Sequence, residues 1–234
     1  MVMSFRPVIA PAIAELRPDF RLLSVVARDL VNREDDAEAG AFLADACSRL
    51  DEATWAADHL AAWQETYKAF GAKPQRTPCS AEALRKRVAK DGRVPSANAV
   101  VDIYNAVSLR FAVPVGGENL AAYIGMPHLV RATGAEAFDT AKDGIPIQEL
   151  VDAGEVIWQD ELGATCRRWN WRQGRRTRIE PDSRDIWFVL EALGSMPDAA
   201  LEEASEVFIR QLRRLSPGAT FEIEVIRAVT GQGA

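Results

Sequence analysis

Apolar residues recur at helical spacing in five stretches of the chain, and elsewhere they form short runs separated by turn residues. The stretches that predict helices are 34–50, 52–70, 81–90, 98–111 and 198–215. The short runs that predict strands are 7–9, 12–16, 22–27, 121–124, 129–132, 155–159, 166–172, 176–179, 186–192 and 220–225. We therefore expect an α+β fold with a mostly antiparallel β-sheet core and packed helices.

The helix expected at 98–111 interrupts its apolar surface with a stripe of polar residues. Asn98, Asp102 and Asn105 lie four and three positions apart, so they share one side of the helix. Because an unpaired buried amide or carboxylate costs several kcal/mol, each of the three needs a hydrogen-bond partner. Such a stripe either holds a neighbouring loop or lines a pocket. The adjacent glycines Gly116 and Gly117 indicate backbone that approaches another group closely.

Arginine and tryptophan alternate in the segment 166–178, where Gly174 suits a hairpin turn. Strand periodicity would place Arg167, Trp169 and Trp171 on one face. The other face would carry Arg168, Asn170 and Arg172. The six arginines of this segment, with no acid among them, are Arg167, Arg168, Arg172, Arg175, Arg176 and Arg178.

This segment has two interpretations. Arginines interleaved with aromatic rings suit a phosphate backbone with stacked bases. Alternatively, the tryptophans fill the core and the arginines pair with acids from elsewhere in an acidic protein. Cys166 lies among these arginines, which would lower the pKa of its thiol, but the sequence offers no base for a catalytic thiol.

Composition narrows the function classes. The 234 residues carry a net charge of −6, so any contact with nucleic acid depends on a local basic patch. The three cysteines, Cys47, Cys79 and Cys166, are far apart and form no metal-binding pattern with the two histidines. No signal peptide or membrane span is evident. We expect a cytoplasmic protein with no metal, no cofactor and no membrane contact, and the sequence predicts no particular oligomeric state.

Two motifs resemble a known family. The run from Pro95 to Leu109, followed by Pro114-Val-Gly-Gly, resembles the Val-Val-Asp-x-x-Asn-x-x-x-Leu…Pro signature of the phenylalanyl-tRNA synthetase beta subunit. That signature belongs to the editing module, the B-three/B-four tRNA-binding domain. The segment 155–193, which ends in a Leu-Glu-Ala sequence at Glu191, is similar to the second half of the same module.

The resemblance covers roughly residues 80–230 and implies a freestanding editing-type domain. It implies an editing-like tRNA-binding domain over 76–234 and a strand-helix-helix extension over 1–75, packed on the main domain. The parent module hydrolyses tyrosine wrongly attached to the phenylalanine tRNA. It uses no aminoacylation chemistry, so no ligase activity is expected here.

The resemblance also implies site residues. Glu191 matches the acidic residue that recognises the misattached amino acid, and it could also orient a water. Gly116 and Gly117 match the loop that faces the ester, so these three are the catalytic candidates. The substrate-pocket candidates are Asn98, Asp102, Asn105, Trp169 and Asn170. The RNA-binding candidates are Arg93, Arg167, Arg168, Arg172, Arg175 and Arg176.

The chain departs from the family pattern at three places. Gly116 replaces a loop histidine, Arg93 only approximates the arginine before the helix, and 166–171 replaces a glycine-containing strand. We expect a tRNA-binding hydrolase that deacylates mischarged aminoacyl-tRNA in trans. Two alternatives stay open: a non-catalytic RNA-binding module, and a binder or hydrolase of a free amino-acid derivative.

Overall fold

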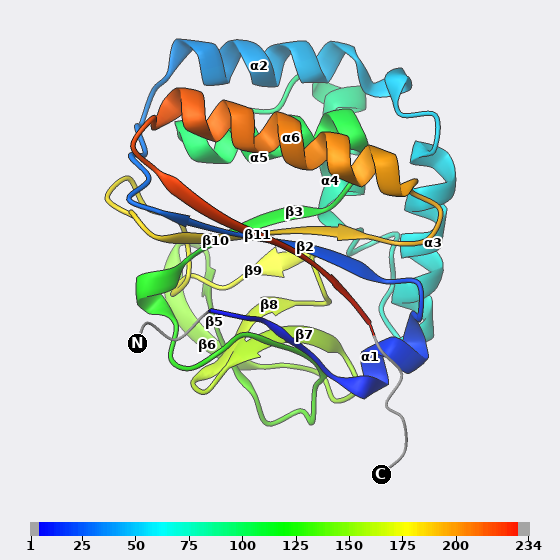
Figure 1. Ribbon diagram of the computed structural model, residues 1–234. Helices are drawn as coiled ribbons and strands as arrows, with labels where there is room; N and C mark the ends of the chain where they lie inside the picture. The colour runs from blue at the N-terminus through cyan, green and yellow to red at the C-terminus, as the bar shows by residue number, and fades with distance from the viewer. Residues whose placement is uncertain (1–4, 229–234) are drawn as a thin grey trace.

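The chain folds into three layers, in which two β-sheets are stacked and helices cover the outer face of one sheet (Figure 1). The computed structural model describes residues 5–228. The helices are α1 (Pro11–Leu16), α2 (Ala37–Ser48), α3 (Ala56–Ala69), α4 (Ser80–Asp91), α5 (Ala99–Phe111) and α6 (Asp198–Leu215), with the short 3-10 helices η1 (Leu50–Glu52) and η2 (Leu120–Ala122).

The upper sheet of Figure 1 has four antiparallel strands in the order β11-β2-β10-β3. The strands are β2 (Arg21–Arg28), β3 (Val115–Asn119), β10 (Ile186–Ala192) and β11 (Thr220–Arg227). β10 is buried along its whole length. β3 is an edge strand that pairs with β10 alone.

The lower sheet has seven strands in the order β1-β4-β7-β8-β5-β6, and β9 pairs with β8. The strands are β1 (Val8–Ile9), β4 (His128–Arg131), β5 (Ala137–Lys142), β6 (Ile145–Leu150), β7 (Val156–Asp160), β8 (Gly163–Arg167) and β9 (Arg172–Gln173). Only the β1–β4 and β5–β8 pairs are parallel among the described strands. The predicted α+β class with a mostly antiparallel sheet core is therefore confirmed.

Strand β10 divides the core between the layers. Phe188 and Leu190 pack toward α5 and α6, whereas Trp187 and Val189 pack toward the lower sheet. This alternation follows from the two-residue period of a strand. One face of β10 thus packs into the helix-covered core, and the other face packs between the two sheets.

The first 75 residues supply parts of this core. β2 is paired on both sides, by β10 and by β11. His59 of α3 is fully buried, its Nδ1 lies 2.8 Å from the Ala112 oxygen, and its Nε2 accepts the Leu193 N–H over 3.0 Å. Burial lowers the pKa of His59 to about 4, so the ring is neutral. The division at residue 75 remains a prediction.

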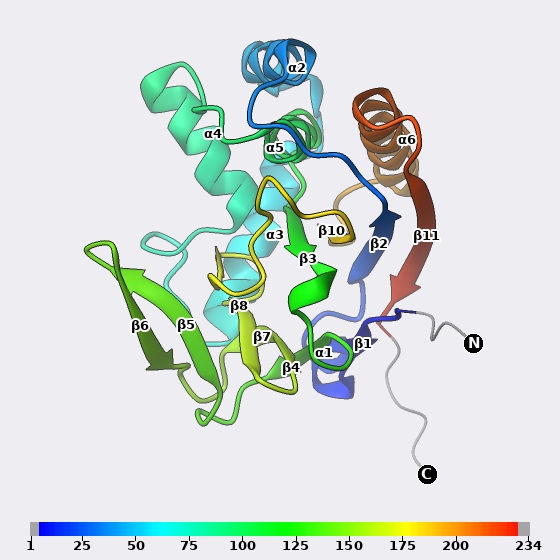
Figure 2. The ribbon, with the colours of Figure 1, turned by 90° about the vertical axis from the view of Figure 1, so that its left-hand side faces the viewer.

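Three predicted strands are wrong, for local reasons. Residues 12–16 belong to α1, where Pro11 occupies the first helical turn, a position that favours proline. Residues 121–124 include the end of η2, and 176–179 form an irregular loop. The sequence analysis also missed the β5–β6 hairpin, which projects to the side of the other strands in Figure 2.

The predicted strand 166–172 is also wrong, because the chain turns inside it. β8 ends at Arg167, and the next two residues, Arg168 and Trp169, have positive φ angles of 48° and 67°. The chain resumes as β9 at Arg172. The hairpin therefore turns at 168–171 rather than at Gly174, and the predicted alternation of faces does not hold.

Candidate functional site

A cavity of about 270 Å³ lies between the two sheets and the start of α4. Four indole side chains line it, from Trp158, Trp169, Trp171 and Trp187, and we call it the tryptophan cavity. Its polar lining comprises the carboxyls of Glu118 and Glu191, the amides of Asn105, Asn170 and Gln173, the hydroxyl-bearing Ser80, and Arg172. Gly116 and Gly117 complete the wall along β3.

Glu191 is almost fully buried and is held by donors from the facing sheet and the turn. The Trp158 indole donates to its Oε1 over 2.9 Å, and the Asn170 amide donates to its Oε2 over 2.9 Å. The Tyr67 hydroxyl in turn donates to the Asn170 Oδ1 over 2.8 Å, which orients that amide. Three separate elements therefore fix one carboxyl.

Burial raises the pKa of Glu191 to about 7, despite the opposing hydrogen bonds from Trp158 and Asn170. The indole of Trp169 also lies close enough to lower this pKa, although its Nε1 makes no hydrogen bond of good geometry to the described residues. A carboxyl with a pKa near 7 exchanges a proton at neutral pH, which is the property required of a general base.

The ladder between β3 and β10 sets the direction of the backbone groups on β3. The Glu191 N–H donates to the Pro114 oxygen over 3.0 Å, and Gly116 lies opposite Val189 two positions further along. Backbone groups of successive residues in a strand point to opposite sides, so those of Pro114 and Gly116, two positions apart, point to the same side. The N–H of Gly116 therefore points toward β10, where the ladder uses it.

Gly117 points the other way, toward the open edge of the sheet. Its oxygen accepts a hydrogen bond of 2.9 Å from the Gln173 side chain, and the N–H of a strand residue lies on the same side as its oxygen. Within residues 5–228 no partner for this N–H is found. Of the two candidate glycines, Gly117 is therefore the one whose N–H points away from β10.

The polar stripe on α5 is split between two tasks. Asn98 caps the helix by accepting the Val101 N–H over 3.0 Å. Asp102 accepts from the Ser96 hydroxyl over 2.5 Å and from the Ala97 N–H over 3.0 Å, so it holds the preceding loop. Only Asn105 of the stripe lines the tryptophan cavity. The predicted placement of Asn98 and Asp102 in the pocket wall is not met.

The turn at 168–171 inserts its indoles into the protein. Trp169 is fully buried and packs against Trp63 and Phe20, with ring centroids 5.2 Å and 5.0 Å away. Arg168 stacks over Trp171 with its Cζ 4.6 Å from the ring centroid. The interpretation in which tryptophans fill the core therefore holds for Trp169, which is at the same time part of the cavity wall.

Several arginines of the predicted RNA patch are paired with acids. Arg167 is buried and contacts Glu155 at 2.8 Å, Asp152 at 3.2 Å and Glu149 at 3.5 Å. Burial and these ion pairs argue against its predicted role in RNA binding. The acids come from segments outside the arginine stretch, which is why sequence proximity did not reveal them.

The remaining arginines differ in how open they are. Arg176 pairs with Asp160 at 2.7 Å, and Arg168 contacts Asp152 at 3.4 Å. Arg172 and Arg175 are exposed and form no ion pair with the described residues, and Arg172 lines the tryptophan cavity. Arg93 lies elsewhere, beside a depression between α2 and the end of α4.

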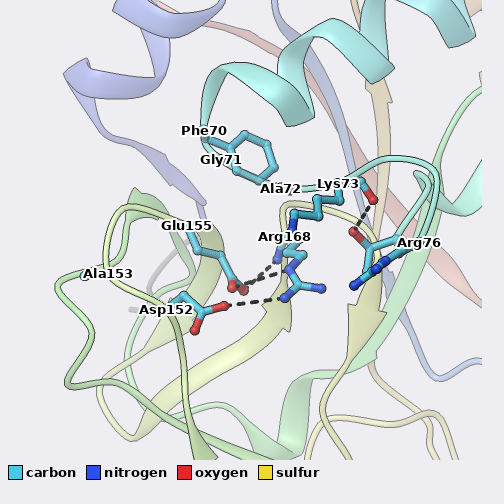
Figure 3. Close-up of a pocket in the computed structure, with 10 residues that line it drawn as sticks. Phe70, Gly71, Ala72, Lys73, Arg76, Asp152, Ala153, Glu155 and Arg168 are labelled. Carbon is cyan, nitrogen blue, oxygen red and sulfur yellow. Dashed lines mark hydrogen bonds and ion pairs between the residues drawn. The ribbon is translucent and has the colours of Figure 1, made fainter.

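A second cavity, of about 500 Å³, lies between the α3–α4 connection and the loop before β7 (Figure 3). We call it the lysine–arginine cavity, because Lys73, Arg76 and Arg168 line it together with Asp152 and Glu155. Lys73 and Arg76 are exposed and form no ion pair with the described residues. Arg168, which also lines this cavity, begins the turn whose next three residues line the tryptophan cavity. The two cavities are therefore neighbours.

Cys166 does not have the predicted low pKa. Its thiol is buried, and desolvation together with the nearby carboxyls of Glu118 and Glu191 raises its pKa well above the ordinary value. A thiol in this environment is protonated and is a poor nucleophile.

Within residues 5–228, no group of three or more histidine, cysteine, aspartate or glutamate side chains is arranged to hold a metal ion. None of the described helices is both long enough and apolar enough to cross a membrane.

Comparison with known proteins gives three findings. A family model, the B3/4 domain, matches residues 62–217. A solved structure, an N-terminal fragment of the phenylalanyl-tRNA synthetase beta subunit from Pyrococcus horikoshii, is similar with a TM-score of 0.50 and 9% sequence identity. That match covers 92% of this chain and 49% of the fragment, so the chain spans about half of the fragment's length, and the likeness concerns the fold alone.

A curated protein, the O-methyltransferase gedA of Aspergillus terreus, is 40% identical over 75 residues. The match covers 29% of this chain and 13% of that protein, too little of either to show a family. The B3/4 model, in contrast, spans α4, α5, β3, β10 and α6, the elements that surround the tryptophan cavity and the helix-covered core. The chain therefore belongs to the B3/4 domain family.

Proposed function

We propose that the protein hydrolyses the ester between an amino acid and the 3′ end of a tRNA, and that the amino acid lies in the tryptophan cavity. The observation that carries this proposal is the cavity itself, where a buried carboxyl with a pKa near 7 and an unpaired edge amide share one wall in a B3/4 domain chain. The likeness to a tRNA synthetase fragment supports a tRNA-related role.

The size and lining of the cavity suit an amino-acid side chain. A volume of about 270 Å³ accepts one such group and no base pair, and the four indoles provide an apolar surface. Arg172 is exposed and is the one lysine or arginine among the described residues that line the cavity, so it is open to a phosphate of the attached RNA.

Hydrolysis needs a base for the attacking water and a donor for the developing oxyanion. In the proposed step the carboxylate of Glu191 takes a proton from water as the water oxygen bonds to the ester carbon. The Gly117 N–H stabilises the carbonyl oxygen. The bond from the ester carbon to the ribose oxygen then breaks, and the proton passes from Glu191 to that oxygen.

The RNA backbone would pass along the exposed cations that adjoin the cavity. Arg172 and Arg175 follow the turn, and Lys73 and Arg76 line the neighbouring lysine–arginine cavity (Figure 3). Sequence reasoning missed Lys73 and Arg76 because they lie outside the arginine stretch and approach it only through the α3–α4 connection.

The test is deacylation of a panel of mischarged tRNAs by the purified protein. We expect at least one aminoacyl ester to be cleaved faster than without protein, and Glu191→Gln to lose most of that acceleration, about 100-fold or more. Glu203→Gln, a matched change on the exposed surface of α6, should leave the rate unchanged. If wild-type and Glu191→Gln proteins cleave every ester equally, the enzyme proposal fails.

Binding of uncharged tRNA distinguishes the hydrolase from a non-catalytic module. The double variant Lys73→Ala with Arg172→Ala should weaken binding and reduce the slope of log K against log salt by about 2, since two phosphate contacts are lost. Arg210→Ala on α6 is the control. Binding without any hydrolysis would favour the non-catalytic module.

The pairing of the arginines favours a second candidate, a binder or hydrolase of a free amino-acid derivative. Arg167 and Arg176 form ion pairs with Glu155 and Asp160, so the unpaired basic surface is smaller than the sequence predicts. Cleavage of small amino-acid esters with no effect of added tRNA would support this candidate.

A further inference from the structure

Glu118 is a second buried carboxyl in the tryptophan cavity, and the proposed hydrolysis does not use it. It lies on β3 directly after Gly117 and opposite Trp187 of β10. The residue is 7% exposed, yet its side chain belongs to the cavity wall. Neither the sequence motifs nor the arginine segment pointed to it.

Polar neighbours hold Glu118 in place without neutralising it. The Tyr123 hydroxyl donates to its Oε2, and the Thr165 side chain also favours its ionised form. Arg176 also favours the ionised form of Glu118, but its guanidinium forms an ion pair with Asp160 at 2.7 Å. Among the described residues no lysine, arginine or histidine forms an ion pair with Glu118.

A buried carboxyl without a cation is energetically costly when ionised. The pKa of Glu118 is accordingly raised to about 8, mainly by burial and to a smaller extent by the nearby Asp160 and Glu191. A ligand with a positive charge would stabilise the ionised carboxylate of such a site more than a neutral ligand would. Indole rings attract cations across their faces, and Trp158 and Trp187 also line the cavity.

The strand register separates Glu118 from Glu191. Glu118 lies opposite Trp187, which is four residues before Glu191 on the same face of β10. At about 3.3 Å per residue the two backbone positions are about 13 Å apart along the strand. The two carboxyls therefore extend from separate points of the cavity wall.

We propose that Glu118 binds the α-ammonium group of the ligand, so that the cavity accepts esters of amino acids with a free amine and rejects N-acylated ones. This rests on the proposed function, in that the ligand is an amino-acid ester. Its α-nitrogen is two bonds from the carbonyl carbon, and Glu118 is the residue next to Gly117, the donor proposed for the carbonyl oxygen. One ligand can thus meet both groups.

The experiment measures binding of small, unreactive analogues to the full chain. A panel of L-amino-acid amides and their N-acetyl counterparts is titrated against the wild-type protein, followed by indole fluorescence and by calorimetry. At least one free-amine amide should bind ten times or more tightly than its N-acetyl partner. Equal affinity of the two forms, or no binding of any free-amine amide at millimolar concentration, would overturn the proposal.

Variants assign the effect to Glu118. Glu118→Gln should remove the preference for the free amine while leaving the affinity for N-acetyl amides unchanged, and Tyr123→Phe should weaken the preference less. Glu203→Gln is the control. If Glu118→Gln keeps its near-ultraviolet circular dichroism and still prefers the free amine, Glu118 is not the ammonium site. Since binding is measured without tRNA or hydrolysis, this result is independent of whether deacylation occurs.

Discussion

The two faces of strand β10 show how one strand separates folding from function. Toward the helices, Phe188 and Leu190 are fully buried in an apolar core and carry no polar atom on their side chains. Toward the lower sheet, Trp187 and Glu191 adjoin a cavity whose buried carboxyls form no ion pair with the described residues. The helix face gains stability from close packing, whereas the cavity face retains groups that reduce stability and suit a ligand.

The largest expected contrast comes from truncating neighbouring residues on the two faces. Leu190→Ala should lower the free energy of unfolding by about 2–5 kcal/mol, because it leaves a hole in the helix-covered core. Val189→Ala, at the cavity, should cost about 1 kcal/mol, since the surrounding space is already open on one side. Urea denaturation of both variants measures the difference. Equal losses would contradict the separation of the faces.

The second contrast is in the pH dependence of stability. Because the pKa of Glu191 is raised to about 7 in the folded state, the folded protein holds this proton more tightly than the unfolded chain does. The contribution of protonated Glu191 to the free energy of unfolding is complete below about pH 4.5. It is lost as the pH rises through 7, and the loss is about 3 kcal/mol. Glu191→Gln should therefore gain stability relative to wild type as the pH increases over this range.

His59 acts in the opposite direction, so the comparison must be made between variant and wild type. The pKa of His59 is lowered to about 4, and its contribution to stability is lost as the pH falls from about 6.5. Both proteins contain His59, so its effect cancels in the difference. A difference that stays constant from pH 5 to 8 would contradict a raised pKa for Glu191.

The adjacent glycines provide a third contrast. A Cβ on Gly117 would lie 2.7 Å from the Ile179 side chain and 2.8 Å from Phe188, so Gly117→Ala should destabilise the fold by about 1–3 kcal/mol. A Cβ on Gly116 meets only Val189, at 3.4 Å. Gly116→Ala should fold normally and weaken binding of amino-acid amides. Thermal melts and titrations of the two variants test this, and a destabilised Gly116→Ala would count against it.

The smallest expected effect concerns the surface charges. Arg175→Ala alone should weaken tRNA binding a few-fold and reduce the salt slope by about 1. Arg210→Ala, on the far side of the helix-covered core, should change neither quantity. Filter binding at several salt concentrations measures both, and an equal effect of the two changes would mean that the basic surface near the cavity has no special role.

The sequence predicted the elements whose signals are local. The amphipathic helix 198–215 and the strand 186–192 have the predicted bounds. Asn105, Gly117 and Glu191, which the family motifs singled out, all line the tryptophan cavity. The Asp143-Gly144 pair was a sufficient signal for the β5–β6 hairpin, since both residues have positive φ angles, as this type of turn requires. This hairpin is absent from the predicted strands.

Other features depend on contacts that are distant in sequence. The left-handed conformations of Arg168 and Trp169 are unfavourable for such residues and persist because tertiary packing imposes them. The acids that bind Arg167 come from the segment 149–155. Glu118 joins the cavity only through the register of β3 on β10, which no local pattern encodes.

A crystal structure with a non-hydrolysable 3′-aminoacylamino-adenosine would show whether the tryptophan cavity holds the aminoacyl end of a tRNA. We expect the amino-acid portion among the four indoles, with its carbonyl oxygen at the Gly117 N–H and its ammonium group at Glu118. The adenosine should lie toward Arg172. An analogue bound elsewhere on the protein, or a cavity that stays empty at saturating analogue, would contradict the account.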